Sequence, residues 1–165
     1  MADKCSAVMA SPIGTLLLEA RSGRMTSLVI LAADRPCPER LAPAGPSEPV
    51  LVEAQRQLDE YFAGRRTGFD LPVDLSGCPP FTRKVLETLQ TIGFGLTIGY
   101  GTLAARVGSP RGARAVGRAM ARNPLPVIIP CHRVVAADGQ LGGYSGGAGL
   151  PVKMWLLALE QGPRR

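Results

Sequence analysis

Five prolines between residues 36 and 49 divide this chain of 165 residues into two parts. Proline fixes one backbone dihedral and lacks an amide donor, so a segment this rich in proline forms neither a helix nor a central strand. We expect a surface loop of variable conformation there. The spacing of apolar residues differs on its two sides.

Before this loop, three short apolar runs are separated by turn signals. The runs cover residues 7–10, 15–20 and 25–31. The turns are Ser11-Pro12-Ile13-Gly14 and Arg21-Ser22-Gly23-Arg24. This pattern predicts an antiparallel meander of three strands. Residues 49–63 then show a partly helical pattern that ends at Gly64, and this helix is suited to packing over the sheet.

The second half of the chain reads as mostly helical. The expected helices cover residues 81–92, 100–107, 110–122 and 151–160. We place a domain boundary within residues 71–80, which gives an N-terminal α/β support domain (1–75) and a functional C-terminal domain (76–165). The expected fold class is α+β: a small antiparallel sheet with a helix, followed by a mostly helical, winged-helix-like part with a helix-turn-helix.

That candidate helix-turn-helix consists of residues 100–107, a turn at Gly108, and a second helix that Ser109 would cap and Pro110 would begin. Alone the signal is weak, because two short helices around a glycine usually reflect ordinary packing.

The charge distribution strengthens the signal, because residues 81–133 carry eight basic side chains and one acid, Glu87. Four arginines fall on one side of the second helix: Arg111, Arg114, Arg118 and Arg122. Such a stripe favours contact with DNA phosphates over a solvated face, where mixed charge is usual. Three small residues would let the helix backbone approach a groove closely: Ala113, Ala115 and Gly117.

The richest chemical signal is Cys131, which lies between flanking prolines and next to His132 and Arg133. Cysteine reacts as the thiolate, which neighbouring cations or a base can favour, and these two neighbours could supply such surroundings. A bare Cys-His pair is also compatible with an inert buried cysteine beside a surface histidine.

Other patterns bound the function. The four cysteines show no C-x-x-C spacing and the chain has one histidine, so we predict no metal site. No apolar stretch approaches the roughly 20 residues of a membrane span. Free thiols point to a reducing, cytoplasmic setting.

The segment Pro130-Cys131-His132-Arg133-Val134 resembles the signature of the O6-alkylguanine-DNA alkyltransferases, also called methylated-DNA–protein-cysteine methyltransferases. Further motifs resemble that family in the same order: Tyr100, Arg114-Ala115-Val116-Gly117, Asn123-Pro124, Tyr144-Ser145-Gly146-Gly147, and Trp155-Leu156-Leu157 with Glu160. The resemblance covers nearly all of residues 80–162, and the turn Ser11-Pro12-Ile13-Gly14 resembles the N-terminal domain of the family.

The resemblance implies a catalytic relay. Cys131 would be the nucleophile, His132 its base through a bridging water, and Glu160 the residue that orients the imidazole. Tyr100 would donate to N3 of guanine, and the amide of Ser145 to the departing O6.

It also implies a base pocket that Tyr144 walls. The carbonyls of Cys131 and Val134 would read the exocyclic amine of guanine, and Asn123 and Pro126 would shape the site.

For DNA, the resemblance implies that the second helix enters the minor groove of the duplex without sequence preference and that Arg114 fills the space of a flipped-out base. The reaction would transfer the alkyl group from O6 of guanine, and also from O4 of thymine, once per protein molecule and without a cofactor. The protein would be a monomer that can cluster on DNA.

Three alternatives stay open. A damage-binding relative without transfer activity would lack the cysteine that this chain retains. A cysteine hydrolase would need a histidine brought in from elsewhere in the fold, and the only histidine is adjacent to Cys131. A transcriptional regulator would explain the basic helix but not the Cys131, His132 and Glu160 set.

Overall fold

The computed structural model describes residues 4–32 and 48–163. Most of the expected proline-rich loop, residues 36–46, lies outside these residues. Pro49 belongs to a helix, where it occupies the first turn and its missing amide donor costs nothing. Within the described part of the chain, no helix has both the length and the apolar character that a membrane span needs.

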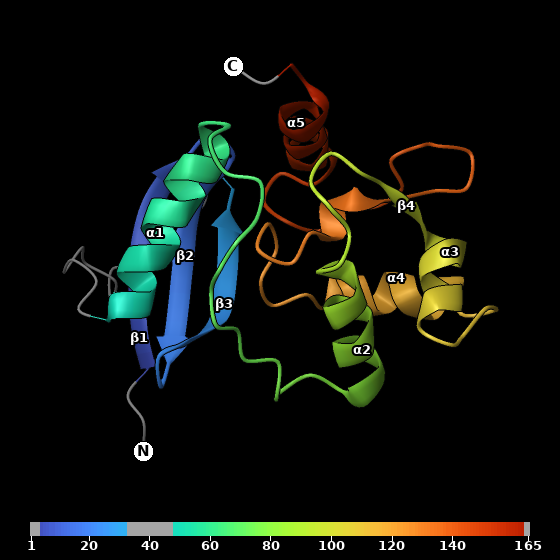
Figure 1. The fold of residues 1–165 in the computed structure, drawn as a ribbon, viewed down its shortest axis with the longest axis horizontal. Helices are drawn as coiled ribbons and strands as arrows, with labels where there is room; N and C mark the ends of the chain where they lie inside the picture. Colours follow the sequence, from blue (N-terminus) through green and yellow to red (C-terminus); the bar gives the residue numbers. More distant parts are fainter. Residues whose placement is uncertain (1–3, 33–47, 164–165) are drawn as a thin grey trace.

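The N-terminal part is the expected antiparallel meander, with strand order β1-β2-β3. The strands are β1 (Lys4–Ser11), β2 (Gly14–Arg21) and β3 (Arg24–Leu31). Along β2, Leu16, Leu18 and Ala20 are fully buried, and the residues between them are partly exposed. This period of two places one apolar face against α1 (Pro49–Phe62), which lies across the sheet in Figure 1.

β3 is the strand nearest the second half of the chain (Figure 1), and two segments that follow α1 in the sequence cover its open edge. Met25 exchanges backbone hydrogen bonds with the chain around Val73: its amide donates to Pro72 O at 2.8 Å, and its carbonyl accepts from Asp74 N at 2.9 Å. Further along, Leu28 N donates to Pro124 O at 2.8 Å. An unpaired edge would otherwise expose free donors and acceptors, and the bond to Pro124 joins the sheet to the helical part of the chain.

The second half is mostly helical and confirms the α+β class. Its elements are α2 (Pro80–Leu89), β4 (Ile98–Gly99), α3 (Tyr100–Arg106), α4 (Ala113–Ala121), a 3₁₀ turn (Cys131–Arg133), β5 (Val134–Val135) and α5 (Leu150–Gln161). β4 and β5 pair in parallel. The division into domains at residue 75 stays a prediction.

The expected start of the second helix at Pro110 is wrong, because α4 begins at Ala113. The preceding residues close a turn in which Gly112 N donates to Ser109 O at 2.7 Å. A Cβ at Gly112 would lie 2.9 Å from the backbone carbonyl oxygen of Ser109, so the tight turn favours glycine. Ser109 therefore does not cap the helix, and Arg111 belongs to the turn.

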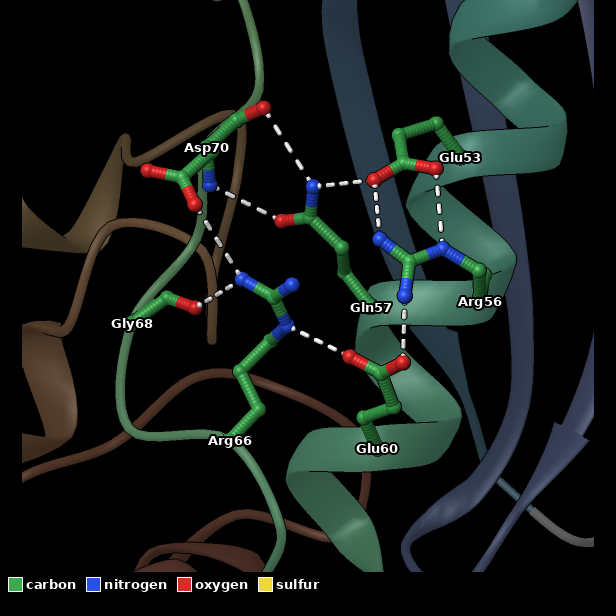
Figure 2. Close-up of polar contacts among 7 residues, drawn as sticks. All are labelled: Glu53, Arg56, Gln57, Glu60, Arg66, Gly68 and Asp70. Carbon is green, nitrogen blue, oxygen red and sulfur yellow. Dashed lines mark hydrogen bonds and ion pairs between the residues drawn. The ribbon is translucent and has the colours of Figure 1, made fainter.

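A polar network ties the segment that follows α1 back onto the helix (Figure 2). The amide of buried Gln57 pairs with the backbone of Asp70: Asp70 N donates to Oε1 at 2.8 Å, and Nε2 donates to Asp70 O at 3.3 Å. Arg66 joins Glu60 at 2.8 Å and the Asp70 carboxylate at 3.3 Å. Arg56 bridges Glu53 and Glu60 on the exposed side.

We expect Gln57→Ala to lower the free energy of unfolding by about 2 kcal/mol, because it removes the buried side-chain amide that makes two hydrogen bonds with the backbone of Asp70, each contributing about 1 kcal/mol. Urea denaturation measures the change. The matched control is Arg56→Ala one position away, where exposed ion pairs contribute little. Equal losses of unfolding free energy in the two variants would contradict the conclusion that the buried amide of Gln57 contributes most to holding this segment on α1.

Candidate active site

Cys131 follows a second proline-containing loop, residues 123–130, and the side chain of Asn123 holds the backbone of this loop in place. Asn123 Nδ2 donates to Ile129 O at 2.9 Å, and its Oδ1 accepts from Leu125 N at 3.0 Å. Cys131 N also donates to Ile129 O at 2.8 Å. Cys131 then begins the 3₁₀ turn. Successive residues of such a turn point about 120° apart, so Cys131 and His132 still face different directions.

The thiol of Cys131 is deeply placed but reaches two cavities, with 9% of the residue exposed. Burial raises the pKa of this thiol, while a hydrogen bond with Asn123 and the charge of Lys153 act in the opposite direction. The resting group is therefore a neutral thiol that needs a base when it reacts. The expectation that Arg133 would favour the thiolate is wrong, because its guanidinium binds Glu160 instead.

Two cavities meet at Cys131. The larger, of about 380 Å³, also has Tyr100, Gly117, Tyr144 and Ser145 in its wall, together with Met120, Ala121 and Gly143. Its volume lies in the range of small-molecule sites, about 300–1,000 Å³. The smaller, of about 190 Å³, is lined by Asn123, Pro126 and β3 residues. Most of the predicted pocket residues therefore converge on one sulfur.

Tyr100 begins α3, lines the larger cavity and lies against the glycine-rich loop, residues 142–147. Burial raises the pKa of its phenol, with a smaller lowering from a hydrogen bond with the backbone of Gly143, so the group stays protonated as a donor. Gly142 has φ +67°, and a Cβ there would lie 2.9 Å from the Tyr100 hydroxyl. The loop can approach the tyrosine this closely only because residue 142 is glycine.

Behind Cys131, His132 and Glu160 form a buried pair with 2.8 Å between Nε2 and Oε1. Arg133 donates to both oxygens of Glu160 at 2.9 Å, and Gly95 N donates to Oε2 at 3.3 Å. Tyr61 on α1 donates to Oε1 at 2.6 Å. Burial alone would raise the pKa of Glu160, but the hydrogen bonds from His132 and Arg133 lower it to about 2.

This arrangement fixes the tautomer of His132. An ionised carboxylate only accepts hydrogen bonds, so Nε2 must carry the hydrogen and Nδ1 is left with its lone pair. Nδ1 is buried and has no hydrogen-bond partner among the protein atoms of the described residues. Burial lowers the pKa of His132, more than the pairing with Glu160 raises it. The imidazole is therefore neutral near pH 7 and able to accept a proton at Nδ1.

Lys153 is a buried cation that the sequence reasoning missed. Its Nζ donates to Val134 O at 2.6 Å, to Gly143 O at 3.3 Å, and to Leu141 O. It thereby ties the glycine-rich loop to the strand that follows Cys131.

The predicted DNA-contacting residues lie on and around α4. Arg114 and Arg118 are exposed on the helix, and Arg122 is exposed at its C-cap. Ala113, Ala115 and Gly117 are half-buried, and Gly117 lines the larger cavity. The wall of the larger cavity therefore contains both residues of α4 and Cys131.

The sequence analysis missed Lys153 and Tyr61, and only Lys153 has a sequence pattern that could have revealed its buried role. Lys153 interrupts an apolar run of α5, and a charge at such a position is a cue for a buried role. Tyr61 gave no cue, because it fits the apolar pattern of α1 and meets Glu160 across 99 residues of sequence.

A cysteine thiol that opens into a cavity beside a basic helix-turn-helix suits an enzyme that reacts with a base of DNA. Two family models match the chain: the ribonuclease-like domain of 6-O-methylguanine DNA methyltransferase over residues 5–75, and the DNA-binding domain of that protein over residues 80–162. The chain belongs to this family.

Individual proteins agree with this assignment. The methylated-DNA–protein-cysteine methyltransferase of Mycobacterium leprae is 44% identical, over 93% of this chain and 90% of its own. The constitutive enzyme of Bacillus subtilis is 40% identical, with 92% of each chain covered. A structure of Mycobacterium tuberculosis OGT in complex with DNA is 39% identical, with TM-score 0.82 over 94% of this chain and 92% of its own.

These findings confirm the family, the fold class and the activity expected from the sequence: DNA repair by direct transfer of an alkyl group to the protein, with DNA as the partner. They favour an alkyltransferase over the cysteine hydrolase and the transcriptional regulator.

Proposed function

We propose that Cys131 is the acceptor in the repair of O6-alkylguanine, and of O4-alkylthymine, in flipped-out nucleotides. The supporting observation is that this thiol opens into a cavity of about 380 Å³ while a buried imidazole–carboxylate pair lies directly behind it. In the transfer, a carbon–sulfur bond forms as the bond between the alkyl carbon and O6 breaks. The thiol proton passes through a water to His132 Nδ1, which has its lone pair available.

The leaving guanine needs a proton as its oxygen departs, because its anion is a poor leaving group. Tyr100 supplies this proton at N3, and its raised pKa keeps the phenol protonated until then. The phenolate then regains a proton from solvent, and His132 releases to solvent the proton that it took from the thiol. The backbone amide of Ser145 donates to O6. Both residues line the larger cavity, on the same hollow as the sulfur.

The base is selected by the pocket walls. Tyr144 packs beside it, and Pro126 with Asn123 shapes the second cavity. The carbonyls of Cys131 and Val134 accept from the exocyclic amine. Lys153 supports this arrangement because it holds Val134 and the glycine-rich loop together.

The duplex is held through its minor groove without sequence preference. The small residues Ala113, Ala115 and Gly117 keep α4 slim, and the exposed Arg114, Arg118 and Arg122, with Arg111 in the preceding turn, face phosphates. The protein acts as a monomer that can cluster on DNA. We place it in the cytoplasm, and no cofactor takes part.

Each protein molecule reacts once, because the thioether product does not reverse. The test is the intact mass of the protein after incubation with duplex DNA that contains O6-methylguanine. We expect a gain of one methyl group per chain, and undamaged duplex of the same sequence is the control. Folded protein that gains no methyl group would end the proposal.

Arg114→Ala should reduce the rate of transfer from duplex DNA about tenfold or more, while reaction with free O6-benzylguanine changes little. The reason is that Arg114 acts on the stack, and opening a base pair costs a few kcal/mol that the free base does not require. Single-turnover rates on both substrates measure this ratio. Arg106→Ala, an exposed arginine on α3, is the control. Equal losses on duplex and free base would refute a role in base flipping.

A further inference from the structure

Tyr61 connects the N-terminal part of the chain to the catalytic pair. It lies in the last turn of α1 and is fully buried. Its hydroxyl donates to Glu160 Oε1 at 2.6 Å, and the same oxygen accepts from His132 Nε2 at 2.8 Å. The hydroxyl thus shares its acceptor oxygen with the hydrogen bond that orients the imidazole.

The phenol of Tyr61 is suited to be a permanent donor. Burial, and then the charge of Glu160, raise its pKa far above the usual range for tyrosine. The hydroxyl therefore keeps its proton wherever the protein is folded. A donor on Oε1 restricts the carboxylate and makes that oxygen less basic toward His132.

The ring that carries this hydroxyl is itself held in place. Its centroid lies 5.2 Å from that of Phe69, 5.5 Å from that of Phe62 and 6.1 Å from that of Phe94. Phe69 belongs to the segment that Gln57 and Arg66 tie onto α1, as Figure 2 shows through its neighbours Gly68 and Asp70. The polar network thus supports the position of Tyr61.

We propose that Tyr61 is a positioning residue of the relay. Its hydroxyl fixes the position of Glu160 Oε1 and makes this oxygen, which orients His132, less basic. This inference rests on the proposed alkyl transfer. It makes the N-terminal part of the chain a component of the catalytic apparatus, where the sequence suggested only a support.

The chain contains a single histidine, so nuclear magnetic resonance of ¹⁵N-labelled imidazole reports on His132 alone. We expect the wild-type ring to carry its hydrogen on Nε2. In Tyr61→Phe, the more basic carboxylate should hold the imidazolium more strongly. The pKa of His132 should therefore rise by about half a unit or more. The acid limb of the transfer rate should move to higher pH by the same amount.

The other charged groups around the pair are Arg133 and Lys153, which lower the pKa of His132, and both remain in this variant. Val50→Ala is the control, because it loosens the packing of α1 at the opposite end of the helix and keeps the hydroxyl and its aromatic cluster. It should leave the His132 titration and the acid limb unchanged. A folded Tyr61→Phe with unchanged titration and unchanged acid limb would reduce Tyr61 to a packing residue.

A second measurement covers the case in which Tyr61→Phe does not fold. The chain has three tyrosines, so the double variant Tyr100→Phe, Tyr144→Phe retains Tyr61 alone. Replacing this tyrosine with 3-fluorotyrosine strengthens the donor and should lower the pKa of His132 relative to the same variant with ordinary tyrosine. Identical titrations would overturn the inference. Since this readout needs no DNA, it stands apart from a failure of the wild type to accept an alkyl group.

Discussion

Cys131→Ser should abolish the gain of a methyl group from O6-methylguanine DNA, with a rate at least about a thousandfold below the wild type. A serine hydroxyl ionises far less readily than a thiol, and the relay behind it is matched to a sulfur whose pKa burial already raises. Because serine is close in size to cysteine, the loop that Asn123 braces should keep its shape. The measurement is intact mass over a time course, with affinity for the damaged duplex recorded in parallel.

The expected result is a folded protein that binds damaged DNA and does not react with it. Cys78→Ser is the matched control, because Cys78 is a half-buried thiol outside the two cavities at Cys131. The Cys78→Ser protein should accept the methyl group at the wild-type rate. A methyl adduct on the Cys131→Ser protein would show that another side chain is the acceptor.

Glu160→Gln should destabilise the protein by about 3–5 kcal/mol, because it leaves the guanidinium of Arg133 buried without its counter-charge. The low pKa of Glu160 gives a similar size: a fall from 4.5 to about 2 corresponds to about 3 kcal/mol. Urea denaturation near pH 7 measures the loss. Glu87→Gln, an exposed carboxylate on α2, is the control and should change little.

The same shift predicts how stability depends on pH. A carboxyl group with a lowered folded-state pKa stabilises the protein above its unfolded-state pKa, so this contribution is complete above about pH 4.5 and is lost as pH falls toward about 2. The wild type should therefore lose stability over this interval, and Glu160→Gln should lose less. Parallel acid-denaturation curves for the two proteins would contradict a buried ionised Glu160.

The helix start is a case in which local rules failed. Ser109-Pro110 satisfies the usual preferences for a helix start, yet the chain first closes a turn at Gly112 and begins α4 at Ala113. Local capping preferences amount to about 1 kcal/mol, and the packing of α4 against α2 and α3 outweighs them. Arg111 consequently precedes α4 and is not part of the arginine stripe on the helix that the sequence predicted.

The N-terminal meander, the helices apart from the start of α4, the α+β class and the family followed from the sequence alone, because apolar periodicity, turn residues and the Cys131 motif are all local patterns. The parallel pair of β4 and β5 did not follow, because its two short strands lie far apart in the sequence. Partner choice did not follow. Arg133 binds Glu160 instead of supporting the thiolate, Lys153 holds the glycine-rich loop, and Tyr61 reaches Glu160 from α1. A buried charge must find its counter-groups wherever the fold brings them, so only the tertiary structure decided which residues tune His132.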